Sequence, residues 1–128
     1  RTGDWQGYHG VPALVTVDLG RVHRIASMDV GVLQDVKSWI WGPSEVQFRT
    51  SMDGVTFEEF GRERPGMDPQ QYGAHSRRIR AEGSRKARYL QLELSPFNGG
   101  VIPDWHPGRG NPTWVFADEF GFEAVPVP

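Results

Sequence analysis

The sequence predicts an antiparallel β-sandwich or barrel made of about seven or eight short strands. Three observations support this fold class. Short stretches alternate apolar and polar residues, and the 16 glycines and 10 prolines are spread along the chain instead of being clustered. No long window has the helical period of 3.6 residues. A chain of 128 residues without an internal repeat is predicted to form one domain, residues 1–128, with its own core.

The first half of the chain contains four stretches with a strand-like pattern. Met28, Val30 and Val32 share one face of their stretch, and Val46 and Phe48 share one face of the next. The Asp-Gly pair at 53–54 suits a tight turn, because both residue types tolerate positive φ. The strands expected here are 13–19, 24–33, 45–50 and 57–60.

The second half contains three more such stretches. Residues 75–81 are mostly polar, which predicts a strand at the edge of a sheet. Leu90, Leu92 and Leu94 face the core from the following strand. The last strand is expected to hold its large aromatic residues in one phase. The strands expected here are 75–81, 88–94 and 114–123, the last with Trp114, Phe116, Phe120 and Phe122 on one face.

Three segments lack strand periodicity, and they hold most of the tryptophans. Loops are normally polar, so aromatic residues in loops indicate either packing or ligand binding. The segments are 1–12, 35–43 and 96–112, and they contain four of the five Trp, namely Trp5, Trp39, Trp41 and Trp105.

Composition excludes several functional classes. The net charge of −2 argues against nucleic acid or an anionic membrane as a general partner. No apolar run approaches the roughly 20 residues that span a bilayer, so membrane insertion is not expected. The absence of cysteine rules out disulfides and a thiolate nucleophile. Six basic residues between Arg77 and Arg88 are expected to form a solvated face of the domain.

Several motifs resemble discoidin domains, also called coagulation factor V/VIII type C domains. The run Val17–Gly20 followed by Ile25 resembles their "DLG" segment, and Ser51–Gly54 after Val46 resembles their strand and turn. Ala87–Leu92 resembles their "ARY" strand. The resemblance implies a jelly-roll β-sandwich of the galactose-binding-like fold.

A narrower resemblance is to the C-terminal accessory domain of bacterial family-20 β-N-acetylhexosaminidases. It rests on Asp4–Tyr8, on Gln34–Asp35 with Ser38–Ile40, and on Pro103–Gly108 with Trp114–Glu119. It implies an accessory domain cut from a larger glycoside hydrolase that is secreted, periplasmic or on the cell surface. Its partner would then be the catalytic domain of the same polypeptide.

The resemblance also bears on metal binding. Relatives often hold a structural calcium with an N-terminal loop and a carboxylate near the last strand, and this sequence lacks the full N-terminal stretch. The residues that correspond to the remaining half of such a site are Glu119 and Asp4.

A sugar site would combine an aromatic ring for stacking with polar groups that fix the hydroxyls. The candidate ligand-binding residues are Trp105, His106, Asp104, Arg109, Trp39 and Trp41. Each Trp has the alternative of plugging the end of the sandwich, and His106 that of a structural histidine. No nucleophile or paired carboxylates accompany His106, so we expect no enzyme activity.

Two functions remain from different classes. The first is a carbohydrate-binding module, similar to carbohydrate-binding family 32, for amino-sugar or galactose-type glycans. The second is a structural domain that docks on and stabilises its catalytic domain without binding sugar.

Overall fold

A computed structural model of the chain describes residues 6–127 as one antiparallel sheet of six strands. The strand order in the sheet is β1-β6-β2-β5-β3-β4. Two short 3-10 turns, η1 and η2, follow the long strands. None of the helical segments in the described part of the chain is long enough to cross a membrane. The elements are β1 (Gln6–His9), β2 (Ala13–Asp35), η1 (Val36–Ser38), β3 (Glu45–Ser51), β4 (Glu58–Glu63), β5 (Ala74–Ser95), η2 (Phe97–Gly100) and β6 (Trp114–Pro126).

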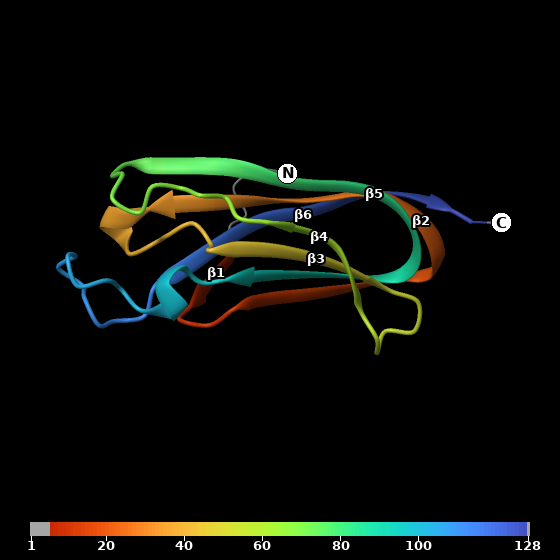
Figure 1. Cartoon of the computed structure of the whole chain (residues 1–128), viewed down its shortest axis with the longest axis horizontal. Coiled ribbons are helices and arrows are strands. Elements are labelled where there is room, and N and C mark those ends of the chain that lie inside the picture. The colour runs from red at the N-terminus through yellow and green to blue at the C-terminus, as the bar shows by residue number, and fades with distance from the viewer. Residues whose placement is uncertain (1–5, 128) are drawn as a thin grey trace.

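The sheet folds over on itself because β2 and β5 bend together and continue from one layer into the other. Residues 13–18 of β2 pair with the end of β5, which also pairs with β3. Residues 23–33 of β2 pair instead with β6 and with the start of β5. Both strands turn over at the end of the molecule that lies opposite the long loops (Figure 1). Gly20, with φ of 83°, lies where the register of β2 and β5 shifts.

This continuity corrects the expected number of strands. The stretches 13–19 and 24–33 belong to one strand, and so do 75–81 and 88–94. A bend that preserves the hydrogen-bonded pairing does not end a strand, although its glycine and polar residues resemble a turn in sequence. The predicted fold class, an antiparallel β-sandwich, is confirmed.

The core lies between the layers and confirms most of the predicted faces. Phe48 is fully buried beside Val46 from β3, as are Leu90 and Leu94 from β5. Met28 from β2 joins the same cluster. The polar stretch 75–81 lies where β5 has only β2 as its neighbour, so its placement at an edge is also confirmed.

The prediction that four aromatic residues of β6 share one phase is wrong. Val115 is fully buried, so Trp114 and Phe116 face outward, where Trp114 stacks on His9 at 4.3 Å. Phe120 instead packs against the core. The phase changes because the β2–β6 register shifts opposite Glu119, whose φ of 44° is left-handed.

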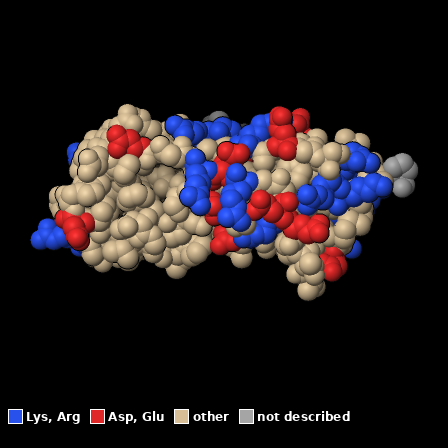
Figure 2. All heavy atoms as spheres, in the orientation of Figure 1, with Lys and Arg blue, Asp and Glu red and all other residues tan. Residues whose placement is uncertain are grey.

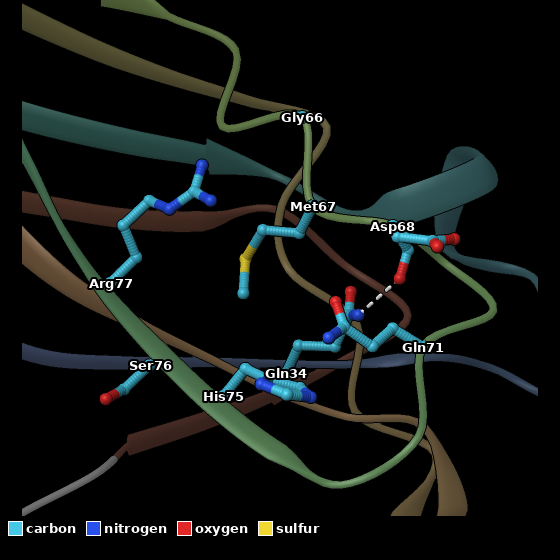
Figure 3. Close-up of a pocket in the computed structure, with 8 residues that line it drawn as sticks. All are labelled: Gln34, Gly66, Met67, Asp68, Gln71, His75, Ser76 and Arg77. Atoms are coloured by element: carbon cyan, nitrogen blue, oxygen red, sulfur yellow. Dashed lines mark hydrogen bonds between the residues drawn. The ribbon is translucent and has the colours of Figure 1, made fainter.

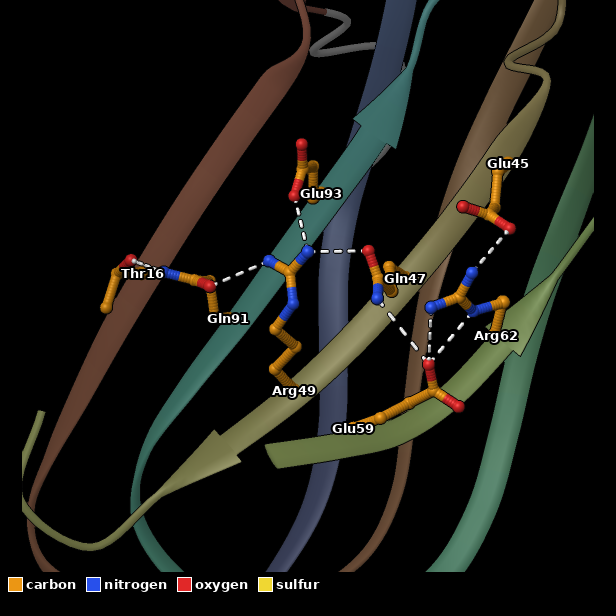
Figure 4. Close-up of polar contacts among 8 residues, drawn as sticks. All are labelled: Thr16, Glu45, Gln47, Arg49, Glu59, Arg62, Gln91 and Glu93. Atoms are coloured by element: carbon orange, nitrogen blue, oxygen red, sulfur yellow. Dashed lines mark hydrogen bonds and ion pairs between the residues drawn. The ribbon is translucent and has the colours of Figure 1, made fainter. Parts of the chain in front are cut away.

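A polar network crosses β2, β5, β3 and β4 on their outward face, in the layer of the sandwich that contains β3 (Figure 4). Arg49 lies at its centre and donates to Gln91 at 2.8 Å, and to Gln47 and Glu93 at 2.5 Å each. Figure 2 shows acidic and basic side chains mixed over the strands, while the loop end is mostly uncharged. These groups neutralise one another and leave the loop end as the chemically distinct part of this surface.

Candidate functional site

The segments predicted as aromatic loops meet at one end of the sandwich. The segment after β2 and the segment after β5 lie together there, opposite the bend of the long strands (Figure 1). Trp39 packs closely against the second of these segments, residues 96–113, which forms the second loop. A Cβ on Gly108 of this loop would lie 2.7 Å from the Trp39 indole ring. Backbone hydrogen bonds from Ile102 to Asn111 and from Gly110 to Ile102 close the second loop on itself. The loop end is therefore a packed structure with defined positions for its side chains.

Trp41 lies buried beneath the loops at this end of the sandwich. It is fully buried and forms a small apolar cluster with Val36 and Ile102. Its Nε1–H donates to the carbonyl of Pro69 at 3.0 Å, which fixes the loop between β4 and β5. Its ring also meets the Trp105 ring edge-on at 6.3 Å. Trp41 thus supports two separate parts of the loop end.

His106 is a structural residue of the second loop. Its side chain is 4% exposed, and its Nδ1 accepts a hydrogen bond from the backbone N–H of Gly108 at 2.9 Å. Its Nε2 must then carry the proton that is donated to the carbonyl of Val36 at 3.0 Å. Both ring nitrogens are occupied by the fold, so neither is free for a ligand or for proton transfer.

Trp105 is the exposed aromatic residue of this loop. Its side chain is 42% exposed, while its ring makes edge contacts with Trp41 and His106 at 6.3 and 5.8 Å. Asp104 and Arg109, from the same loop, are also exposed. The ring is therefore held from below and open to solvent, with an acidic and a basic group in the same segment.

The structure divides the six candidate ligand residues into two groups. Trp105, Asp104 and Arg109 are accessible, and Trp39 is half-buried. Trp41 and His106 are too buried to present a surface to a ligand, because they fill the space between the loops. The packing alternative considered for every Trp thus describes the position of Trp41.

Calcium binding by Glu119 and Asp4 stays a prediction, because Asp4 lies outside the described residues. The carbonyl of Glu119 accepts a hydrogen bond from the Arg78 guanidinium. Within residues 6–127 no group of three or more His, Asp or Glu side chains is arranged to hold a metal.

A polar hollow of about 370 Å³ lies beside these loops (Figure 3). The loop between β4 and β5 forms one wall, and the start of β5 forms the other. Gln34, only 2% exposed, lies at its base and donates to the carbonyl of Asp68 at 2.6 Å. The residues that line the hollow are Gln34, Gly66, Met67, Asp68, Gln71, His75, Ser76 and Arg77.

The hollow was not among the predicted sites, although the sequence carries one signal of it. His75 and Arg77 have the same phase in β5 as Ile79 and Ala81, which face the core. Charged or polar residues in the inward phase of a strand indicate that the strand extends beyond the core over a polar space. Gln34 likewise occupies a buried position at the end of β2.

Comparisons with solved structures identify the same fold. A CBM32 module from a family 31 glycoside hydrolase of Clostridium perfringens matches 92% of this chain over 70% of its own length, at 16% identity and a TM-score of 0.52. The module CpGH89CBM32-6 produced by Clostridium perfringens matches 91% over 75%, at 12% identity and a TM-score of 0.50. The C-terminal domain of a chitobiase from Bacteroides fragilis matches 91% over 66%, at 22% identity and a TM-score of 0.44.

No protein-family model and no curated protein matches the chain. At their identities the two CBM32 modules, with TM-scores of 0.50 and 0.52, establish the fold alone. The discoidin-like galactose-binding fold that the sequence motifs implied is thereby confirmed.

Proposed function

We propose that this chain is a non-catalytic carbohydrate-binding accessory module that binds glycan at its loop end. The observation that carries the proposal is Trp105, an indole that contacts the Trp41 and His106 rings edge-on yet is 42% exposed. An exposed ring that is fixed from below can stack on the C–H face of a sugar without losing much conformational entropy. The likeness to CBM32 modules in fold supports this role.

The neighbouring groups supply the polar part of such a site. A carboxylate such as Asp104 accepts hydrogen bonds from sugar hydroxyls, and a guanidinium such as Arg109 donates to ring and hydroxyl oxygens. Trp39, which is half-buried against Gly108, can extend the aromatic surface. Trp41 and His106 contribute indirectly, because they hold the loop in place.

The chemistry of the loop end argues for binding without catalysis. Both ring nitrogens of His106 are engaged by backbone groups of the fold, so this side chain is not placed to act as a general acid or base. We propose amino-sugar or galactose-type glycans as ligands. We also propose that the parent is a secreted bacterial enzyme of the β-N-acetylhexosaminidase type, with this module beside its catalytic domain.

A glycan array tests the proposal. The domain is applied with and without calcium, alongside the variant Trp105→Ala and the control Met52→Ala. Met52 is 56% exposed and lies in the turn between β3 and β4, so it matches the loss of an exposed apolar side chain. We expect Trp105→Ala to weaken binding by at least about tenfold and Met52→Ala to leave it unchanged. Equal binding by both variants would remove Trp105 from the site.

A second candidate function is docking on the catalytic domain without sugar binding. It is favoured by the exposed apolar side chains Val11 and Val101, 53% and 46% exposed, which accompany Trp105 on the loop segments. Docking predicts that the folded, isolated domain binds no glycan, and that deleting it lowers the melting temperature of the parent enzyme. An unchanged melting temperature would exclude docking as the main role.

A further inference from the structure

Arg77 differs from the other arginines of β5 in its electrostatic partners. Each of the others has a carboxylate within 4 Å, and among the described residues Arg77 has none. Its guanidinium donates to the backbone carbonyl of Pro65. The paired arginines are Arg78 with Asp29, Arg80 with Asp29, Glu82 and Glu123, Arg85 with Glu58, and Arg88 with Asp18. Within residues 6–127 the fold therefore leaves the Arg77 guanidinium without a carboxylate partner.

The position of Arg77 makes this charge available to a ligand. The side chain projects over the polar hollow from the edge of β5, opposite the loop that carries Met67 and Asp68 (Figure 3). Its hydrogen bond to Pro65 fixes it to the far wall, so the planar group keeps a defined orientation. A guanidinium fork in a fixed orientation is suited to a carboxylate, which it can bind through two parallel hydrogen bonds.

The remaining walls of the hollow are suited to sugar hydroxyls. Gln71, His75 and Ser76 supply polar groups, and Asp68 lies across the hollow from Arg77 (Figure 3). Charges of opposite sign at the two sides favour a ligand with its anionic group at one end and its hydroxyls at the other. A volume of about 370 Å³ is within the range of pockets that bind small ligands.

A second depression of about 230 Å³ continues the hollow across the edge of β5, since Ser76 and Arg77 line both. Its other residues include Asp118, whose Oδ1 is buried and has no hydrogen-bond partner within the described part of the chain. That oxygen is shielded from solvent, so it is not placed to meet a ligand in the depression. Arg77, an exposed residue, borders both depressions.

We propose that the polar hollow binds a carboxylated sugar residue, with its carboxylate on Arg77. The inference rests on the proposed glycan-binding function and specifies an acidic class of ligand for a part of the loop end separate from Trp105. The carboxylate can belong to a hexuronate in a polysaccharide or to a sialate at the end of a glycan. Both present the same planar anion to the guanidinium.

The test is calorimetric titration of the domain with three probes, namely a galacturonate tetrasaccharide, sialyllactose and neutral lactose. The variant Arg77→Gln removes the charge, and Arg80→Gln is the matched control, because Arg80 lies on the same strand but outside the hollow. We expect Arg77→Gln to weaken binding of one acidic probe by about 10- to 100-fold, as for a hydrogen bond to a charged group. Arg80→Gln should leave that affinity unchanged, and melting curves confirm that both variants fold.

The outcomes separate this inference from the proposed function. Binding of the galacturonate probe alone supports the hexuronate, and binding of sialyllactose alone supports the sialate. If Arg77→Gln leaves the affinity for both acidic probes unchanged, the inference is overturned while glycan binding stands. If no probe and no array glycan binds the folded domain, the proposed function fails, and the inference fails with it.

Discussion

Replacing Trp41 by Phe tests whether this buried indole supports the loop end as the structure indicates. The change removes the hydrogen bond from Nε1 to the carbonyl of Pro69, 3.0 Å long, which contributes about 1 kcal/mol. The smaller ring also leaves a void in a fully buried position, which adds on the order of 1 kcal/mol. We expect the free energy of unfolding to fall by about 2 kcal/mol, which lowers the melting temperature of a chain of this size by about 6–12 °C.

Calorimetry measures this shift, with Trp39→Phe as the control. Trp39 loses the same part of its ring, but it is half-buried and lies at the surface of the loops, so its effect should stay below about 1 kcal/mol. A Trp41→Phe melting temperature within about 2 °C of the parent, or one no lower than that of Trp39→Phe, would refute the reasoning. It would mean that the bond to Pro69 and the packing of the indole contribute little to stability.

Two further predictions concern the strands. Arg49→Leu should lower the free energy of unfolding by about 1–2 kcal/mol in a urea titration, because Glu93, only 29% exposed, loses its ionic partner. An unchanged free energy of unfolding would show that the charges of the network in Figure 4 are fully screened by solvent. Stability should also fall on acidification. The hydrogen bond from Arg88 lowers the pKa of Asp18 below its usual 3.8, so the stabilisation is present above the unfolded-state pKa and is lost as pH falls through the folded one. Urea titrations at several pH values check this. In the variant Asp18→Asn the free energy of unfolding should fall less steeply as the pH is lowered.

The fold was predictable because the core residues follow the alternation of strands. Val46 with Phe48, and Leu90 with Leu92 and Leu94, are buried on the faces that the sequence indicates. The bends in β2 and β5 were not predictable in the same way. Whether a stretch around Gly20 ends a strand or only bends it depends on the pairing with distant strands, which local sequence does not encode.

The shift of phase in β6 has the same kind of origin. Glu119 adopts a left-handed conformation that glycine usually takes, and nothing in its residue type indicates it. The cause lies in the register with β2, which shifts between Asp29 and Gly31. A pattern read along a single strand cannot detect such a shift, so the aromatic residues on either side of it were assigned to one face.

For the candidate site, the sequence indicated where the aromatic residues gather but not which of them remain accessible. Trp41 and Trp105 are equally apolar and both lie in loops, yet one is fully buried and the other is 42% exposed. Their difference depends on which ring lies beneath the other when the two loops pack. His106 shows the same limit, because its Nδ1 and Nε2 are engaged by backbone groups 2 and 70 positions away in the sequence.

The buried position of Trp41 also links the two parts of the loop end. Its Nε1 holds the loop that forms one wall of the polar hollow, and its ring edge supports Trp105. Displacing this indole should therefore weaken binding at Trp105 and disturb the hollow around Gln34 and Asp68, although Trp41 touches no ligand itself. Glycan affinities of Trp41→Phe should consequently fall for neutral and acidic probes alike, whereas Arg77→Gln should weaken only the binding of the acidic probe that the hollow accepts. This contrast separates a residue that positions the loops from one that binds a carboxylate.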